Sequence, residues 1–359
     1  MNNGNNVLSQ SEIARFMVII VGVVAIVASM RAIASILNPI LIAVLFAVLF
    51  DIPRAWLVKR GMSRGKALLV TILGALLVTL ILIVLMASAF LDLTASLPEY
   101  QQQLEAQLAE LGAKLNQYGI TGDQLKGMAQ SDQSNPLKVI SYVLGGVVSL
   151  LSGALLILVY AIFLLIEAAG FPDKLNAAFK PSEPAYRYLN DVTTNLRNFL
   201  VAQTQVSLAT GVSVTVSLWL LGVEFAVLWG IVAFLMNFIP YIGSILAAIP
   251  AVIVAFIQYG PSITVLLVIG AYLLINVVVN YTIYPRVMSK GVDVSMFIVL
   301  AGMVFWGWVL GPIGLILSVP MTAVIKISLD TFPGSRWLGV MLGAGPKADP
   351  QTEGDTPAA

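Results

Sequence analysis

The sequence contains no histidine and no cysteine among its 359 residues. Without histidine it lacks the commonest general base and metal ligand, and without cysteine it has neither disulfides nor thiolate chemistry. No P-loop or other nucleotide-binding signature occurs, so the sequence does not indicate a protein that is powered directly by ATP. An enzyme remains possible through carboxylates, but the usual catalytic residues are absent. We expect a protein that is not an enzyme, with no cofactor and no bound metal.

Charge is also scarce. Only 10% of the residues are charged, whereas soluble domains carry about 25%. Hydrophobic residues make up 59%, and the net charge of +1 gives no field that would attract nucleic acid. The polar first ten residues lack the basic start of a secretory signal. The composition predicts an all-α polytopic membrane protein whose main partner is the lipid bilayer.

Eight apolar segments account for most of the chain. They cover residues 16–36, 40–57, 67–90, 140–166, 206–221, 225–258, 263–284 and 296–326. Leu37-Asn38-Pro39 predicts a turn between the first two segments. The loop after the second segment holds one acid, Asp51, against the basic residues Arg54, Lys59, Arg60, Arg64 and Lys66. The positive-inside rule therefore makes this loop cytoplasmic, and span counting then predicts that both termini are cytoplasmic.

Two polar stretches separate the apolar segments. Residues 92–139 are acidic and carry leucines at helical spacing, which predicts an extracytoplasmic amphipathic insertion that caps the protein, contacts another copy or binds a ligand. Residues 168–205 predict a cytoplasmic interfacial stretch. The expected divisions are residues 1–91 (spans 1 to 3), 92–139, 140–167 (span 4), 168–205, 206–326 (a transport unit) and 327–359 (a largely disordered tail).

The sixth and eighth apolar segments are each interrupted by proline and glycine. Pro240-Tyr241-Ile242-Gly243 interrupts residues 225–258, and Gly311-Pro312-Ile313-Gly314 interrupts residues 296–326. Proline removes a backbone donor and glycine leaves helical geometry at little cost, so each helix is predicted to stop there. Both segments then form broken or re-entrant helical hairpins, or cross the membrane with an ordinary surface loop; charge does not separate the two. Paired interruptions of this kind indicate a transporter's binding site.

A polar stripe runs along the segment between these interruptions. Tyr272, Asn276, Asn280 and Tyr284 recur every four residues and share one helix face. Such a stripe either joins helices or lines a path. The predicted path comprises Asn237, Pro240, Tyr241, Gly243, Ser244, Tyr272, Asn276, Asn280, Gly311, Pro312 and Gly314. Glu167 and Asp293 are candidate coupling carboxylates, with a simple interfacial position as the alternative.

The motifs of the C-terminal half resemble those of the autoinducer-2 exporter family of bacterial membrane proteins. The matching stretches are Pro240-Tyr241-Ile242-Gly243 with Pro250, Tyr284-Pro285-Arg286-Val287-Met288, and Gly311-Pro312-Ile313-Gly314 with Val319-Pro320. The order of apolar segments from residue 16 to 326 fits as well. The resemblance implies a bacterial inner-membrane protein that transports small solutes and forms a homo-oligomer such as a pentamer.

Members of this family are linked to export of autoinducer-2, and others to exchange of sodium or lithium for protons. The absence of histidine means that any histidine-based coupling does not carry over. We expect a secondary transporter whose site involves the two interruptions and the asparagine stripe. The alternatives are a cation/proton antiporter, an oligomeric channel and a non-transporting membrane scaffold.

Overall fold

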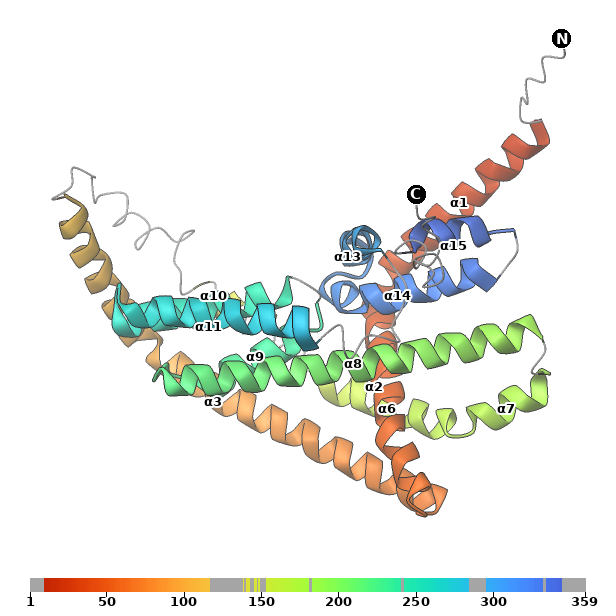
Figure 1. Ribbon diagram of the computed structural model, residues 1–359, viewed down its shortest axis with the longest axis horizontal. Helices are drawn as coiled ribbons and strands as arrows, with labels where there is room; N and C mark the ends of the chain where they lie inside the picture. Colours follow the sequence, from red (N-terminus) through yellow and green to blue (C-terminus); the bar gives the residue numbers. More distant parts are fainter. Residues whose placement is uncertain are drawn as a thin grey trace, which may run out of the picture. The chain divides into compact units, whose positions relative to one another are not determined.

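The computed structural model describes residues 10–116, 138, 140–142, 145–146, 148, 153–180, 183–239, 242–283, 295–331 and 334–343. Over these residues the structure contains helices and no strand (Figure 1). Among the described residues, five helices are long and apolar enough to cross a membrane, and several shorter apolar helices accompany them. The predicted all-α polytopic membrane fold is confirmed.

The helices have these bounds: α1 Gln10–Ala32, α2 Ala34–Lys59, α3 Arg64–Asn116, α6 Ala154–Ala168, α7 Phe171–Ala178, α8 Pro184–Leu220, α9 Ala226–Met236, α10 Gly243–Tyr259, α11 Ile263–Val278, α13 Met296–Leu310, α14 Pro312–Thr331 and α15 Arg336–Leu342. A short π-helix, η1 (Val279–Ile283), continues α11.

The chain divides into two compact units. One unit holds Met1–Val44 together with Asp293–Ala359, and the other holds Leu45–Val292. The expected transport unit of residues 206–326 has helices in both. Whether it acts as one functional unit stays a prediction.

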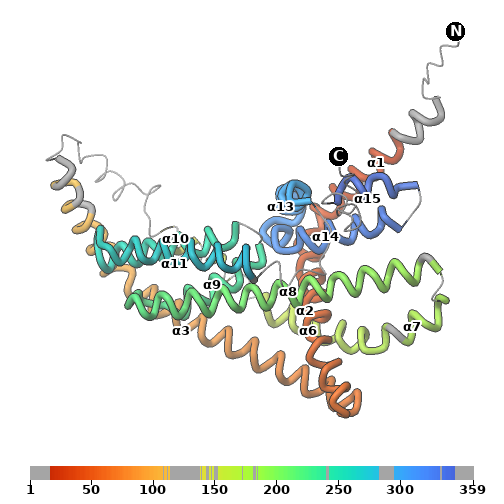
Figure 2. The backbone as a smooth tube through the Cα atoms, viewed as in Figure 1, coloured from red at the N-terminus to blue at the C-terminus, as the bar shows by residue number. Residues whose placement is uncertain are grey.

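The larger unit is organised around α8 to α11. Helix α8 contacts both α9 and α11, and α10 contacts α9 and lies beside α11 (Figure 2). Helices α8 and α9 approach closely where Gly211 meets Gly230, since a Cβ atom added at Gly211 would lie 2.8 Å from the Gly230 carbonyl oxygen. Small residues at a helix crossing permit this kind of packing in membranes.

Helix α3 extends without a break from the basic loop to Asn116. Leucines and valines in its first half are exposed on the surface, as expected of a helix that faces lipid. Further along, Tyr100 and Leu104 are buried in the core that contains α9 and α10. Part of the predicted insertion is therefore a direct continuation of the third apolar segment; residues 117–137 lie outside the described part of the chain.

The predicted turn at Leu37-Asn38-Pro39 is wrong. Only Ile33 separates α1 from α2, and helical hydrogen bonds bridge it: Ile33 N–H donates to Ser29, and Leu37 N–H donates to Ile33. The loss of one backbone donor at Pro39 is tolerated inside an apolar helix. The chain does not reverse here, so counting spans ahead of the basic loop no longer places the N-terminus.

The smaller unit contains a hairpin of α13 and α14. Gly302 packs against Thr322 and Gly307 against Leu315, so the two helices run antiparallel. Trp306 Nε1 donates to Thr322 Oγ1 at 3.3 Å across the hairpin. Helix α1 contacts α13, where the Arg31 guanidinium lies 4.4 Å above the ring of Trp308.

Candidate functional site

The first break is defined as residues 237–242, between α9 and α10. After α9 the backbone forms a tighter turn than an α-helix, because the Ile239 N–H donates three residues back, to the Met236 carbonyl oxygen, at 2.8 Å. Helix α10 then begins at Gly243, whose N–H donates to Ile239. The predicted path residues Pro240 and Tyr241 lie outside the described residues.

Helix α8 supplies the hydrogen-bond partners of the first break. Gln203 Nε2 donates to the Asn237 carbonyl oxygen at 2.7 Å, and Asn237 Nδ2 donates to Ser207 Oγ at 3.1 Å. Gln203 and Ser207 are only 3% and 0% exposed. Backbone that leaves the helix inside an apolar environment must find such partners within the protein. At Asn237 the first break therefore has the partners that irregular backbone needs at membrane depth.

Gly243 packs directly against the backbone on the other side of the first break. A Cβ atom at this position would overlap the carbonyl oxygen of Met236 and lie 3.2 Å from the Asn237 nitrogen. Both neighbours are backbone atoms, which have no rotamer to move to. Ser244, the next predicted path residue, is half-buried at the start of α10.

The second break is Gly311, between α13 and α14. Its φ of 69° lies in the left-handed region, which glycine adopts without strain. Asn38 Nδ2 of α2 donates to the Leu310 carbonyl oxygen at 3.0 Å. Pro312 then opens α14 at its first position, where a missing N–H costs nothing.

Gly314 repeats the role of Gly243. A Cβ atom there would overlap the Trp306 carbonyl oxygen and lie 3.0 Å from the Leu310 Cβ. Gly243 is the first residue of α10, Gly314 lies in α14, and neither has a positive φ. Close approach is therefore what requires them, whereas the sequence predicted a departure from helical geometry. At the second break that departure occurs at Gly311.

The two breaks share one hydrogen-bonding arrangement. In each, a side-chain amide from a helix outside the broken pair donates to the carbonyl at the end of the first arm: Gln203 to Asn237, and Asn38 to Leu310. The groups that bind the breaks are neutral amides and a hydroxyl. Such groups can hold polar, uncharged chemical groups as well as carbonyls.

The predicted asparagine stripe lies at the end of α11. Asn280 Nδ2 donates to Asn276 Oδ1, and both side chains are half-buried. Tyr272 is buried, and its hydroxyl donates to the Ala247 carbonyl of α10 at 3.5 Å. Asn280 lies in η1, and π-helical turns frequently occur at functional sites. Tyr284 lies outside the described residues.

Of the two candidate coupling carboxylates, Glu167 lies among the described residues. Glu167 forms an ion pair with Lys174, and both side chains are well exposed, which favours the interfacial interpretation. Asp293 lies outside the described residues. No group of three metal-binding side chains gathers in the described part of the chain.

A separate polar cluster joins the later part of α3 to the connection between α8 and α9 and to the last turn of α10. Tyr100 donates to the Glu224 carboxylate, and the Glu224 N–H donates to Gln258 Oε1 at 3.0 Å. This cluster fixes the later part of α3 to α10 and to the connection between α8 and α9.

Three of the residues at the breaks were not among the sequence-predicted site residues: Asn38, Gln203 and Ser207. Asn38 was interpreted as a turn former because Pro39 follows it. The sequence held a signal for the other two, because Gln203, Ser207 and Thr210 recur at helical spacing next to an apolar stretch. In the structure all three side chains are buried.

Comparison with known proteins gives a consistent result. Residues 16–334 match the family described as AI-2E family transporter. The AI-2 transport protein TqsA of Escherichia coli K12 is 31% identical over 328 residues, which are 90% of this chain and 94% of that protein. The putative transport protein YhhT of the same organism is 29% identical over 323 residues, 90% of this chain and 92% of that protein.

Proposed function

The chain belongs to the AI-2E family of transporters, as its motifs predicted, and from that premise we propose that it is a secondary transporter of small polar solutes that works around its two helix breaks. The observation that carries this proposal is the arrangement shared by the breaks. Interrupted helices at membrane depth are typical of transporter binding sites, and here side-chain amides, the buried Gln203 and the half-buried Asn38, bond the carbonyls at the two breaks.

We propose autoinducer-2 export as the first activity to test. TqsA carries that substrate in its name, and the neutral amides and hydroxyl at the breaks suit an uncharged polar solute. The alternative is exchange of sodium or lithium for protons, because carbonyl and amide oxygens also bind small cations. The path residues expected from sequence remain part of this proposal; they include Ser244 and Pro312, together with Pro240 and Tyr241, which lie outside the described residues.

Flux into proteoliposomes tests the function. The purified protein is reconstituted, and uptake of labelled autoinducer-2 is measured with and without a proton gradient, alongside sodium-dependent proton movement reported by a pH dye. Saturable, gradient-dependent flux supports a secondary transporter. Flux that rises without saturation indicates an oligomeric channel, and the absence of flux together with co-purifying envelope proteins indicates a scaffold.

Substituting Asn276 and Asn280 with leucine is expected to reduce transport more than stability. Leucine keeps the branched shape of each side chain but removes the hydrogen bond between the two amides and the polar surface beside η1. Transport per folded molecule and melting temperature should be measured for both variants. A lower melting temperature with unchanged transport would show that the stripe only joins helices.

We propose that the protein lies in the bacterial inner membrane as a homo-oligomer such as a pentamer, with the basic loop and C-terminus cytoplasmic. The basic loop after α2 supports this orientation. The mass of the protein in detergent micelles or nanodiscs tests the oligomer. The N-terminus is best placed by a cysteine introduced near residue 10.

The orientation makes a direct prediction for the later part of α3. A cysteine replacing Glu110 is expected to react with an impermeant thiol reagent in intact cells whose outer membrane has been permeabilised. The chain has no cysteine, so the background is clean. Reaction only after the cytoplasmic face is opened would reverse the orientation.

A further inference from the structure

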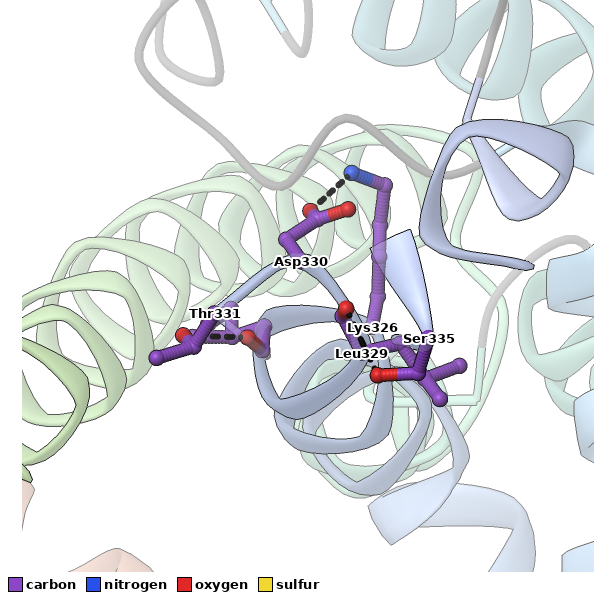
Figure 3. A network of polar contacts seen from close by, with 6 residues as sticks. Lys326, Leu329, Asp330, Thr331 and Ser335 are labelled. Carbon is purple, nitrogen blue, oxygen red and sulfur yellow. Dashed lines mark hydrogen bonds and ion pairs between the residues drawn. The ribbon is translucent and has the colours of Figure 1, made fainter. Parts of the chain in front are cut away.

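The C-terminal helix α15 is attached by polar contacts at both of its ends. Before it, Ser335 Oγ donates to the Leu329 carbonyl of α14 at 3.0 Å (Figure 3). At its far end, the Leu342 carbonyl accepts from the Ser295 N–H at 3.0 Å, and Ser295 also caps α13. A helix of only about two turns that is held at both ends presents a fixed face to its surroundings.

The inner face of α15 rests on an ion pair of α14. Gly339 is buried, and a Cβ atom added there would overlap the Asp330 carboxylate. Lys326 Nζ donates to that carboxylate at 2.7 Å, and the Lys326 side chain is only 11% exposed (Figure 3). Because α14 is a candidate membrane span, its charged pair near the C-terminal end marks the polar boundary of the bilayer. Helix α15 therefore lies at the level of that boundary.

The outer face of α15 is apolar and uncovered. Trp337, Val340 and Met341 are 63%, 66% and 75% exposed. Met296 and Phe297, which directly follow Ser295, are also exposed at this end of the hairpin. Tryptophan is enriched at the membrane–water interface, and an exposed arginine such as Arg336 extends its charge toward headgroups.

We infer that α15 is an interfacial helix whose outer face lies in the bilayer, at the boundary between headgroups and acyl chains. Short amphipathic helices bury their apolar face at that depth. The bilayer is favoured over a second copy of the chain, because stable protein interfaces bury about 800 Å² per partner and seven residues offer too little surface. The inference requires only that the protein is embedded in a membrane, so it stands whether or not the proposed substrate is right.

Spin-label accessibility in the full-length protein tests the inference. Val340→Cys and Met341→Cys are each labelled with a nitroxide and reconstituted into liposomes of bacterial lipid, with Gly334→Cys, an exposed residue of the turn before α15, as the control. Collisions with oxygen, which concentrates in lipid, are compared with collisions with a water-soluble nickel chelate. The ratio of oxygen to nickel accessibility is expected to be several-fold higher at 340 and 341 than at 334.

Two results would overturn the inference. Nickel accessibility at 340 and 341 equal to that at 334 would place the outer face in water. Labels at 340 and 341 that neither reagent reaches would show that a protein surface covers this face. Val340 and Met341 are exposed, and no atom lies within 4 Å of a Cβ added at Gly334, so the variants are expected to fold as the native chain does.

Discussion

Replacing Gly243 with valine is expected to abolish or strongly slow transport while leaving the protein inserted in the membrane. The added Cβ would overlap the Met236 carbonyl oxygen, and that atom belongs to the backbone at the end of α9. Relief therefore requires α10 to move away from α9 or the first break to open. Overpacking of this kind costs about 1–3 kcal/mol, which shifts a two-state equilibrium by roughly tenfold to a hundredfold.

Gly314→Val is expected to act in the same way on the second break, where the overlap is with the Trp306 carbonyl oxygen. Gly270→Val provides a matched control, because Gly270 lies in a helix, α11, and no atom lies within 4 Å of an added Cβ there. Uptake per reconstituted molecule and thermal stability should be measured for all three. Native uptake by both break variants would show that the close approaches do not matter for transport.

The positions of the breaks could be predicted from sequence because their signals are local. Proline and glycine interrupt apolar runs at Pro240 to Gly243 and at Gly311 to Gly314, and helices end in both regions. The membrane class followed from composition in the same way. The close packing that requires glycine at 243 and 314 could not be predicted from such local signals, because it depends on how two helices pack after the chain has turned.

The hydrogen-bond partners of the breaks could not be predicted for a related reason. Gln203 bonds a carbonyl 34 residues away, and Asn38 bonds one 272 residues away. Asn38 also precedes a proline, and that local pattern predicted a turn which the helical hydrogen bonds across Ile33 exclude. Tertiary packing thus overrode the local preference at Pro39, and it also gave the asparagine its partner.

Removing these amide donors is expected to weaken the breaks as much as altering their glycines does. Gln203→Glu and Asn38→Asp keep the shape of each side chain but place a carboxylate, which accepts and does not donate, against a carbonyl oxygen. A buried carbonyl that loses its partner costs about 1–3 kcal/mol, and the added charge in an apolar surrounding increases the penalty. Both variants should show reduced uptake and a lower melting temperature.

The controls separate loss of the hydrogen bond from general damage. Gln205→Glu places the same change on an exposed face of α8, two residues from Gln203, and is expected to leave uptake and melting temperature near those of the native protein. Gln203→Leu removes the donor without adding charge and should show an intermediate loss of stability. If Gln203→Glu and Gln205→Glu behave alike, the bond to the Asn237 carbonyl does not hold the first break. In that case the likeness between the two breaks is one of sequence alone, and the proposal that transport depends on them loses its main structural support.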